Sequence, residues 1–325
     1  MINKEIYEKK FKYGQQENIF NKMVEKTKEY VESNNIKSLI LGISGGIDST
    51  LMAAVCREVS DKLGIPFYGY SLPIKNKLDE LGASDLVGNA FCKKGYYQKI
   101  YLGEFYKSFL INLYNSSSVK NKVNVFNKNI EEIEELMPEQ TKIANGNIMA
   151  RLRMMFLYNQ AGINKGIVID TDNLTEHYLG FWTIHGDEGD FNPTMGGLWK
   201  SEVYSVAKWM QAKYYAAGVF DTEIENIDFY NRSDALYKSI KLIPTDGNGI
   251  SNSDLEQIGG KDYYEVDKIL IPLVCHGEGI IQNLCDEGFD KNTVLRIWER
   301  YKASEFKRRT SRVIKVSREE LFEGL

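Results

Sequence analysis

The chain has few of the residues that build disulfide frameworks or zinc sites. Only four cysteines occur among its 325 residues, at positions 56, 92, 275 and 285. No two of them form a CxxC pair, which argues against a zinc site. Four thiols in a chain of this length also do not suggest a disulfide framework, so we expect the protein to work in a reducing compartment.

Long apolar runs and a surplus of basic charge are missing as well. No stretch approaches the ~18 consecutive apolar residues of a membrane-spanning helix. The first ten residues are charged and lack the apolar core of a signal peptide. The net charge is −4, whereas proteins dedicated to nucleic acids usually carry a basic excess. These absences predict a cytoplasmic protein that binds neither membrane nor nucleic acid.

Apolar strands alternate with amphipathic helices along the chain. Strands are expected at 38–43, 65–71, 97–101 and 166–170, and helices at 16–34, 48–63, 77–92, 146–161 and 173–184. This rhythm predicts an α/β fold, a doubly wound parallel sheet with helices on both faces. A further helix should begin at Ser201, its expected N-cap. We expect residues 1–325 to form a single domain, with 113–145 as a surface insertion, 185–199 as a glycine-rich flap and 305–325 as a basic tail.

The stretch LILGISGGIDSTL, residues 39–51, is typical of a buried strand, a glycine turn and the start of a helix. Backbone N–H groups at a helix N-terminus bind anions, and Gly45 and Gly46 allow a phosphate to approach the backbone closely. Ser44 and Ser49 add hydroxyl donors. In a parallel sheet such a turn lies at the carboxyl edge, where open α/β folds bind their ligands. The stretch therefore predicts a phosphate site.

This loop has no lysine like that of the GxxxxGKS/T phosphate loop, and it carries Asp48 instead. A carboxylate would repel phosphate directly, so its natural role is to hold Mg²⁺ that the phosphate also contacts. The alternative is a plain strand–turn–helix junction with Asp48 as an exposed acid in the first turn. The complete string SGGIDS after an apolar strand favours the phosphate site.

The string SGGIDS at residues 44–49 resembles the SGGxDS pyrophosphate loop of the N-type ATP pyrophosphatases. The resemblance implies the Rossmann-like fold of the adenine nucleotide alpha hydrolases. Enzymes of this superfamily cleave ATP between the α and β phosphates and activate a carbonyl or carboxylate as an adenylate, from which a nucleophile displaces AMP. They include NAD synthetase, GMP synthetase, asparagine synthetase and tRNA-thiolating enzymes, so the loop alone does not select a substrate.

Four further stretches resemble NAD synthetase specifically. They are GNIMARLRM at 146–154, DTDNLTE at 170–176, the glycine-rich segment 186–200 and SEFKRR at 304–309. Their order and approximate spacing resemble the family over residues 38–310. The implied reaction is the amidation of deamido-NAD to NAD through an acyl adenylate, with ATP as co-substrate and ammonia as nitrogen donor.

The resemblance also implies roles for individual residues. The implied catalytic residues are Asp48, Glu176 and Lys200, of which Asp48 and Glu176 hold Mg²⁺. The implied ATP contacts are Gly42, Ile43, Ser44, Gly45, Gly46, Ile47, Asp48, Ser49, Thr171, Lys200 and Thr245. The implied deamido-NAD contacts are Arg151, Asp190, Phe306 and Lys307. Simpler roles stay open, because Glu176 could only close a capping box with Asn173 and Lys307 could belong to a solvated basic face.

The chain departs from the family pattern around the substrate. Ile184 stands where we align a lysine of some bacterial members, Phe306 replaces a histidine, and Asp170 replaces the first glycine of GTDN. Ile184 and Phe306 keep another small carboxylate open as the substrate, and two alternative functions are considered. One is another ATP pyrophosphatase that amidates or thiolates a different small molecule or tRNA. The other is a nucleotide-binding sensor without catalysis, which would have no need of the Asp48–Glu176 metal pair.

The nitrogen donor and the assembly are also expectations. Glutamine-dependent members of the family carry a glutaminase domain in front of this core. About 37 residues precede the first expected strand here, too few for such a domain. We therefore expect free ammonia, or ammonia delivered by a separate glutaminase. The resemblance also implies a homodimer with the dinucleotide near the subunit interface.

Overall fold

The computed structural model describes residues 14–75, 78–117, 122–138, 141–187, 189, 191–192, 195–220, 226–243 and 253–308. Its strands are β1 (Ser38–Gly42), β2 (Phe67–Ser71), β3 (Tyr97–Lys99) and β4 (Gly166–Val168). The helices of the N-terminal half are α1 (Gln16–Ser33), α2 (Ile47–Leu63), α3 (Leu78–Phe91), α4 (Gly103–Ser116), α5 (Ile130–Glu135) and α6 (Thr141–Asn164). They are followed by α7 (Leu174–Leu179), α8 (Lys200–Phe220), α9 (Asn226–Lys241), α10 (Asp254–Ile258), α11 (Tyr263–His276), α12 (Ile281–Asp286), α13 (Lys291–Ala303) and α14 (Glu305–Arg308).

The strands of the described residues form one parallel sheet in the order β3-β2-β1-β4. Leu39 of β1 lies opposite Phe67 of β2 on one side and Ile167 of β4 on the other. The chain runs outward from β1 to β3 and then returns to place β4 on the far side of β1. The topological switch point therefore lies between the carboxyl ends of β1 and β4, where ligands bind in such sheets.

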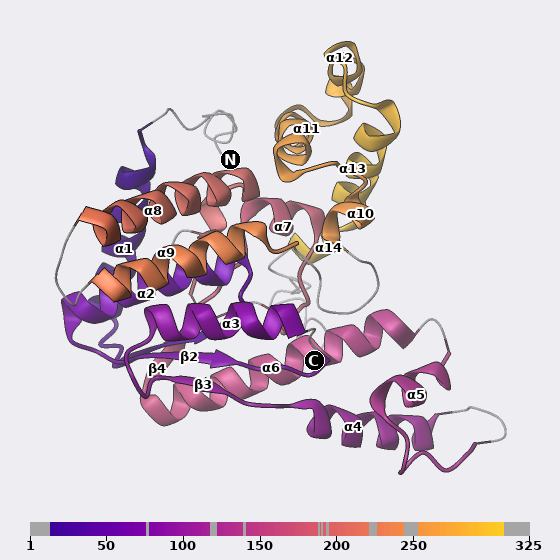
Figure 1. Cartoon of the computed structure of the whole chain (residues 1–325). Coiled ribbons are helices and arrows are strands. Elements are labelled where there is room, and N and C mark those ends of the chain that lie inside the picture. The colour runs from indigo at the N-terminus through magenta and orange to yellow at the C-terminus, as the bar shows by residue number, and fades with distance from the viewer. Residues whose placement is uncertain are drawn as a thin grey trace, which may run out of the picture.

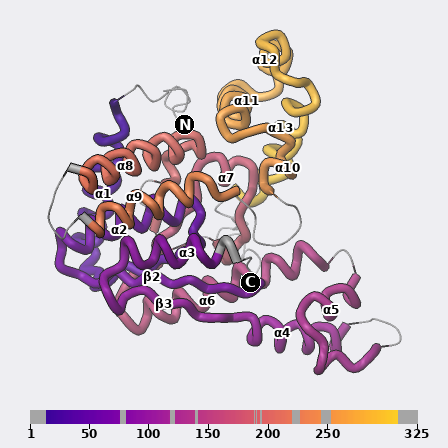
Figure 2. The backbone as a smooth tube through the Cα atoms, viewed as in Figure 1, coloured from indigo at the N-terminus to yellow at the C-terminus, as the bar shows by residue number. Residues whose placement is uncertain are grey.

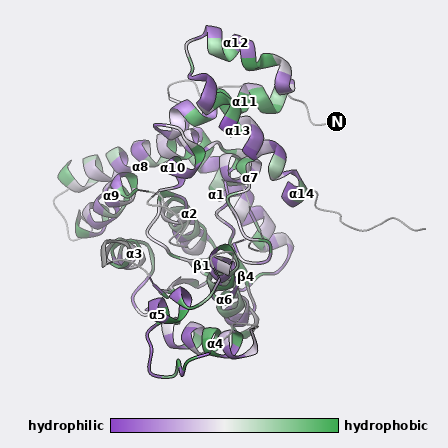
Figure 3. Ribbon diagram, turned by 90° about the vertical axis from the view of Figure 1, so that its right-hand side faces the viewer, coloured by the Kyte–Doolittle hydropathy of each residue, from purple (hydrophilic) through white to green (hydrophobic). Residues whose placement is uncertain are grey.

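Side chains that alternate along β1 enter different layers of the core. Leu39 and Leu41 pack with residues of α1 and α2, whereas Ile40 packs with Met154 and Leu157 of α6. Figure 3 shows α2 and α6 on opposite sides of β1 and β4. Since successive side chains of a strand point to opposite faces, the sheet is covered on both. The predicted α/β fold with a doubly wound parallel sheet is confirmed.

Two further groups of helices lie outside the helices that cover the sheet (Figures 1 and 2). Helices α8 and α9 pack against each other and against α2. The C-terminal helices α10 to α13, drawn in yellow tones, bury a second apolar cluster that includes Leu174 and Leu179 of α7 and Trp199 before α8. This second cluster places the C-terminal helices directly behind the segments that carry Glu176 and Lys200.

The polar stretch at 113–145 has more structure than a surface insertion followed by a short helix. The helix α4 begins ten residues earlier, at Gly103, and α5 follows at Ile130. Tyr106 and Tyr114 of α4 and Ile133 of α5 are buried in a small cluster against α6. Within the described residues, Asn112, Asn115, Asn124 and Asn127 are exposed, so the polar surface of this lobe covers a small apolar cluster.

The helix expected at 173–184 is much shorter in the structure. It ends at Leu179 because Gly180 adopts the left-handed conformation, with φ +70°, that terminates many helices. Residues 180–187 therefore form a loop beside the sheet edge. No helix within the described part of the chain has the length and apolarity to cross a membrane.

Candidate active site

The glycine loop at the end of β1 has the geometry of an anion site. Gly46 is the N-cap of α2, and Ser44 Oγ lies 3.0 Å from Ser49 Oγ across the turn. Gly45 has a φ of +87°, and a Cβ there would lie 2.6 Å from the backbone nitrogen of Ser84. Only glycine fits this position, and the turn leaves the first N–H groups of α2 facing the switch point.

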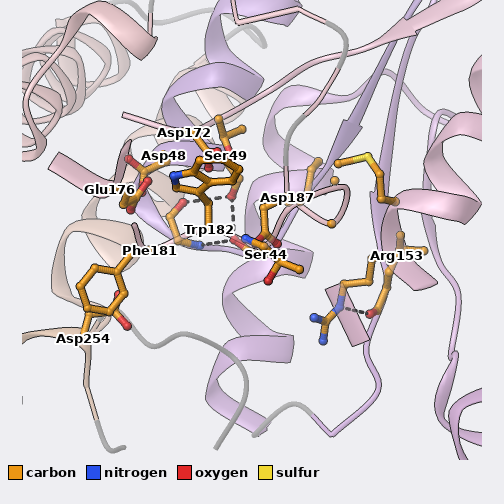
Figure 4. Close-up of a pocket in the computed structure, with 18 of the residues that line it drawn as sticks. Ser44, Asp48, Ser49, Arg153, Asp172, Glu176, Phe181, Trp182, Asp187 and Asp254 are labelled. Carbon is orange, nitrogen blue, oxygen red and sulfur yellow. Dashed lines mark hydrogen bonds between the residues drawn. The ribbon is translucent and has the colours of Figure 1, made fainter. Parts of the chain in front are cut away.

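Two carboxylates from different elements meet on one ammonium group beside this loop. Lys200 Nζ donates a hydrogen bond to Glu176 Oε1 at 2.7 Å and another to Asp48 Oδ2. The lysine side chain is only 2% exposed. Figure 4 shows Asp48 and Glu176 together with Asp172 at one end of the cavity. Residues that lie 24 and 152 positions from Lys200 in the chain thus form one cluster.

Asn173 links the two carboxylates. Its Nδ2 donates to Asp48 Oδ1 at 2.9 Å, and its Oδ1 accepts from the backbone N–H of Glu176 at 3.0 Å. The Glu176 side chain closes the capping box by accepting from the Asn173 N–H. The capping box and the site role of Glu176 therefore coexist, since one carboxylate oxygen caps α7 and the other faces Lys200.

Burial and crowding shift the pKa values in this cluster. Burial, together with the charge of Asp48, raises the pKa of Glu176 to about 7 in spite of Lys200. Burial by itself would lower the pKa of Lys200, but the two carboxylates outweigh it and hold that pKa well above its ordinary value. Burial and the neighbouring Asp170 raise the pKa of Asp172 well above its usual range. The site has more acids than its one buried lysine neutralises, which suits it to bind a further cation.

The cluster fits a magnesium ion. Oxygens of Asp48 and Glu176 already converge on a single cation, the Lys200 ammonium, and carboxylate oxygens are the protein ligands that Mg²⁺ prefers. Within the described residues, no group of three or more acids, histidines or cysteines is placed to hold a metal by itself. Mg²⁺ bound here would keep several ligand positions for phosphate oxygens and water.

A cavity of about 540 Å³ extends from the cluster along the sheet edge. Its size is that of ordinary small-molecule sites. The glycine loop, Asp48 and Thr171 line one part, and Arg153, Trp182 and Lys307 line another. In Figure 4, Arg153 lies at the end opposite the carboxylates. The cavity thus joins a region with carboxylates and the glycine loop to a region with cations and an aromatic ring.

The structure brings most residues of the implied ATP site together. Gly42, Ile43, Ser44, Gly46, Ile47, Asp48, Ser49, Thr171, Glu176 and Lys200 all line the cavity. Gly45 does not line the cavity, but the turn depends on its positive φ. Thr245 lies outside the described residues, although Leu242 and Ile243, just before it, line the cavity.

The residues implied for deamido-NAD are more dispersed. Lys307 lines the cavity, where its Nζ donates to the carbonyl oxygens of Gly180 and Trp182. Arg151 lies on the exposed side of α6 and donates to the carbonyl of Ile184. Phe306 is 58% exposed and does not line the cavity. Asp190 lies outside the described residues.

Several residues that line the cavity carried no predicted role. Arg153, Asp172, Phe181, Trp182 and Asp187 are among them. Arg153 lines the cavity, and its Nε donates to the carbonyl of Leu72 at 3.0 Å. Arginines two residues apart on a helix point to different sides, and only the packing of α6 on the sheet decides which side faces the cavity.

The start of α8 also differs from the prediction. Ser201 is not the N-cap, because the helix begins at Lys200. The backbone N–H of Ser201 instead donates to the carboxylate of Asp267, 66 residues later, at 2.8 Å. The cap comes from a distant helix, which local sequence cannot reveal.

Known proteins resemble the chain over most of its length. A family model described as NAD synthase matches residues 19–311. The NH(3)-dependent NAD(+) synthetase of Fusobacterium nucleatum is 25% identical over 92% of this chain and 96% of its own length. The NH(3)-dependent NAD(+) synthetase of Thermococcus sibiricus is 31% identical. The match covers 58% of this chain and 64% of the relative's length.

Solved structures share the fold. NMN synthetase from Francisella tularensis has a TM-score of 0.65 and 21% identity, over 94% of this chain and all of that one. NH3-dependent NAD synthetase from Campylobacter jejuni, in complex with nitrate, has a TM-score of 0.60 and 23% identity over 92% of this chain and 99% of that one. The family match spans nearly the whole chain, including every element that builds the site, and the chain therefore belongs to the NAD synthase family.

Proposed function

We propose that this protein is an ATP-dependent ligase that converts deamido-NAD to NAD with ammonia as nitrogen donor. The observation that carries the proposal is the meeting of Asp48, Glu176 and Lys200 at the switch point, directly beside the glycine loop. A phosphate loop with a paired-carboxylate cation site fits a reaction in which pyrophosphate leaves. The curated relatives named as NH(3)-dependent NAD(+) synthetases support the same activity.

The residues of the cluster have different roles in binding ATP. The N–H groups and hydroxyls of the loop bind the β and γ phosphates, and Lys200 would turn from the carboxylates to the phosphates if Mg²⁺ replaced it as their counter-ion. Asp48 and Glu176 would hold Mg²⁺, which would supply positive charge to neutralise the departing pyrophosphate. Asn173 keeps Asp48 oriented throughout, because the hydrogen bond that its Nδ2 donates to Asp48 Oδ1 does not involve Lys200.

The chemistry then needs positioning more than a protein nucleophile. The nicotinate carboxylate attacks the α phosphorus of ATP, pyrophosphate leaves, and an acyl adenylate forms. Ammonia attacks the acyl carbon, and AMP leaves with the bonding electrons while a proton passes to solvent. Arg153 and Lys307 add positive charge along the path from the carboxylates, which favours an anionic dinucleotide in this part of the cavity.

We also propose a homodimer. Met155 and Tyr158 lie three residues apart on α6 and are 56% and 42% exposed. Arg151, four residues before Met155, shares this side of the helix and is exposed too. A second copy covering this side of α6 would bring Arg151 to the interface, where the family resemblance places the dinucleotide.

One assay tests the activity. Purified protein is incubated with ATP, Mg²⁺ and deamido-NAD, with ammonium or glutamine, and NAD and AMP are measured. We expect equal amounts of NAD and AMP with ammonium and little NAD with glutamine. A parallel reaction contains nicotinate mononucleotide, because one structural neighbour is an NMN synthetase. If only the mononucleotide is amidated, it is the substrate in place of the dinucleotide. If AMP is released while neither compound is amidated, the protein is another ATP pyrophosphatase.

A further inference from the structure

Asp267 of α11 holds the two backbone segments that carry Lys200 and Glu176. Its carboxylate is 2% exposed and accepts two hydrogen bonds, from Thr175 Oγ1 at 2.6 Å and from the backbone N–H of Ser201 at 2.8 Å. The hydroxyl oxygen of Thr175 in turn accepts from the backbone N–H of Lys200 at 2.9 Å. The Asp267 carboxylate and the Thr175 hydroxyl thus connect the residue before Glu176 to the backbone of Lys200 and Ser201.

These bonds satisfy groups that the helices themselves cannot. The N–H groups of Lys200 and Ser201 are in the first turn of α8 and have no partner within the helix. Trp199, whose carbonyl accepts the first helical bond, has no side-chain oxygen with which to cap it. A buried carboxylate there completes the cap and interacts favourably with the helix dipole. The first two N–H groups of α8 are therefore bound by Thr175 of α7 and Asp267 of α11, whereas Glu202 of α8 itself binds only the N–H of Trp199 before the helix.

We propose that Asp267 is a positioning residue, which sets the distance between Glu176 of α7 and Lys200 of α8 through Thr175. No residue of α11, all of which is described, lines the cavity, so Asp267 does not contact a ligand there itself. The C-terminal helices would then contribute to the reaction as the frame of its cation site. The expected effect of Asp267 on turnover rests on the proposed function. Its expected effect on the geometry of the cluster does not.

Two substitutions remove the link with little change of shape. In Asp267→Asn the amide nitrogen cannot accept, so one of the two bonds is lost. Thr175→Val removes the hydroxyl that joins Asp267 to the Lys200 N–H, whereas Thr175→Ser keeps it. Asp290→Ala is the matched control. Asp290 caps α13 by accepting from Thr293 N, so this variant loses a helix cap far from the cavity.

The measurements are ATP·Mg²⁺ affinity by calorimetry, kcat and KM in the NAD assay, and thermal unfolding. We expect Asp267→Asn and Thr175→Val to weaken ATP·Mg²⁺ binding about tenfold and to lower kcat about ten- to a hundredfold, the range that small misplacements cost. The KM for deamido-NAD should change little. Thr175→Ser should remain within about threefold of the wild type, and Asp290→Ala should lose thermal stability only.

Each result decides one proposal. If Asp267→Asn and Thr175→Val bind ATP·Mg²⁺ and turn over like Asp290→Ala, Asp267 is merely structural and the proposal is wrong. If Asp267→Asn does not fold, Thr175→Val and Thr175→Ser still test the proposal. Equal ATP·Mg²⁺ affinity and turnover of these two variants would show that the Thr175 hydroxyl does not position Lys200. If the wild type makes no NAD, the proposed function fails, while the calorimetric comparison still tests the positioning role.

Discussion

Lys200 Nζ lies 2.7 Å from Glu176 Oε1 and also contacts Asp48, so the ammonium occupies the position expected for a metal ion. One positive charge serves two carboxylates that are both largely withdrawn from solvent. The arrangement keeps the acids together when no nucleotide is bound. It also means that a bound metal ion and Lys200 would compete for the same carboxylate oxygens.

Asp48→Asn and Glu176→Gln should each abolish most of the activity while the fold remains intact. Each amide keeps the shape of its residue but removes a negative oxygen from the cation site. We expect AMP release in the NAD assay to fall about a hundredfold or more, as when a charge-stabilising group is lost. Circular dichroism checks the fold, and Glu299→Gln on the exposed side of α13 is the control. Full activity in either variant would limit that residue to a structural role.

Lys200→Met should make the protein's stability depend on Mg²⁺. The substitution leaves two partly buried carboxylates without their counter-ion, which we expect to cost about 3 kcal/mol of unfolding free energy. Added Mg²⁺ should restore part of this loss in the variant and change the wild type little, because Lys200 already fills the site there. Urea unfolding with and without Mg²⁺ measures both effects. If Mg²⁺ stabilises the two proteins equally, lysine and metal do not share the site.

Gly45→Ala should damage both the loop and the fold. Its φ of +87° strains any other residue, and the added Cβ would lie within 2.8 Å of Ala83 as well as close to Ser84. We expect a loss of about 2 kcal/mol of stability and weaker ATP binding. Gly82→Ala is the control, since its Cβ would meet nothing within 4 Å and alanine should stabilise α3 by about 0.5 kcal/mol. Equal stability of the two variants would contradict the tight packing of the loop.

Glu202→Gln should flatten the dependence of stability on pH. Burial raises the pKa of Glu202 from 4.5 to about 7, although the Trp199 N–H opposes the shift. Between these values the folded protein retains a proton that the unfolded chain has released, so the contribution of Glu202 to stability is lost as the pH rises through about 7. The unfolding free energy of the variant minus that of the wild type should therefore increase from pH 4.5 to 7. A constant difference would show that burial does not perturb Glu202.

Met155→Glu should convert the proposed homodimer to a monomer. A charge at the exposed apolar side of α6 would have to be desolvated against the second copy. Light scattering of the purified protein measures the mass, with 37.3 kDa expected for one chain. Val219→Glu, at an apolar position 51% exposed on α8, is the control and should remain dimeric. A wild-type protein that is monomeric at every concentration tested would rule the dimer out.

The sequence by itself determined the features that depend on residues near one another in the chain. The alternation of strands and helices follows from local periodicity, and the anion loop follows from SGGIDS directly after an apolar strand. The capping box of Asn173 and Glu176 depends on a spacing of three residues, so it too could be read locally. The resemblance to NAD synthetase, confirmed by the family match, then placed Asp48, Glu176 and Lys200 in one site.

Only the tertiary structure decided which side chains face the cavity and what supports them. Arg153 rather than Arg151 lines the cavity because of how α6 packs on the sheet. Asp267 caps α8 from 66 residues away, and no local pattern encodes that contact. Helix α4 buries Tyr106, Leu110 and Tyr114 at a spacing of four residues, but only the fold decides that α5 and α6 cover this side of it. Contacts between distant segments depend on how whole elements pack, and packing is a property of the folded chain.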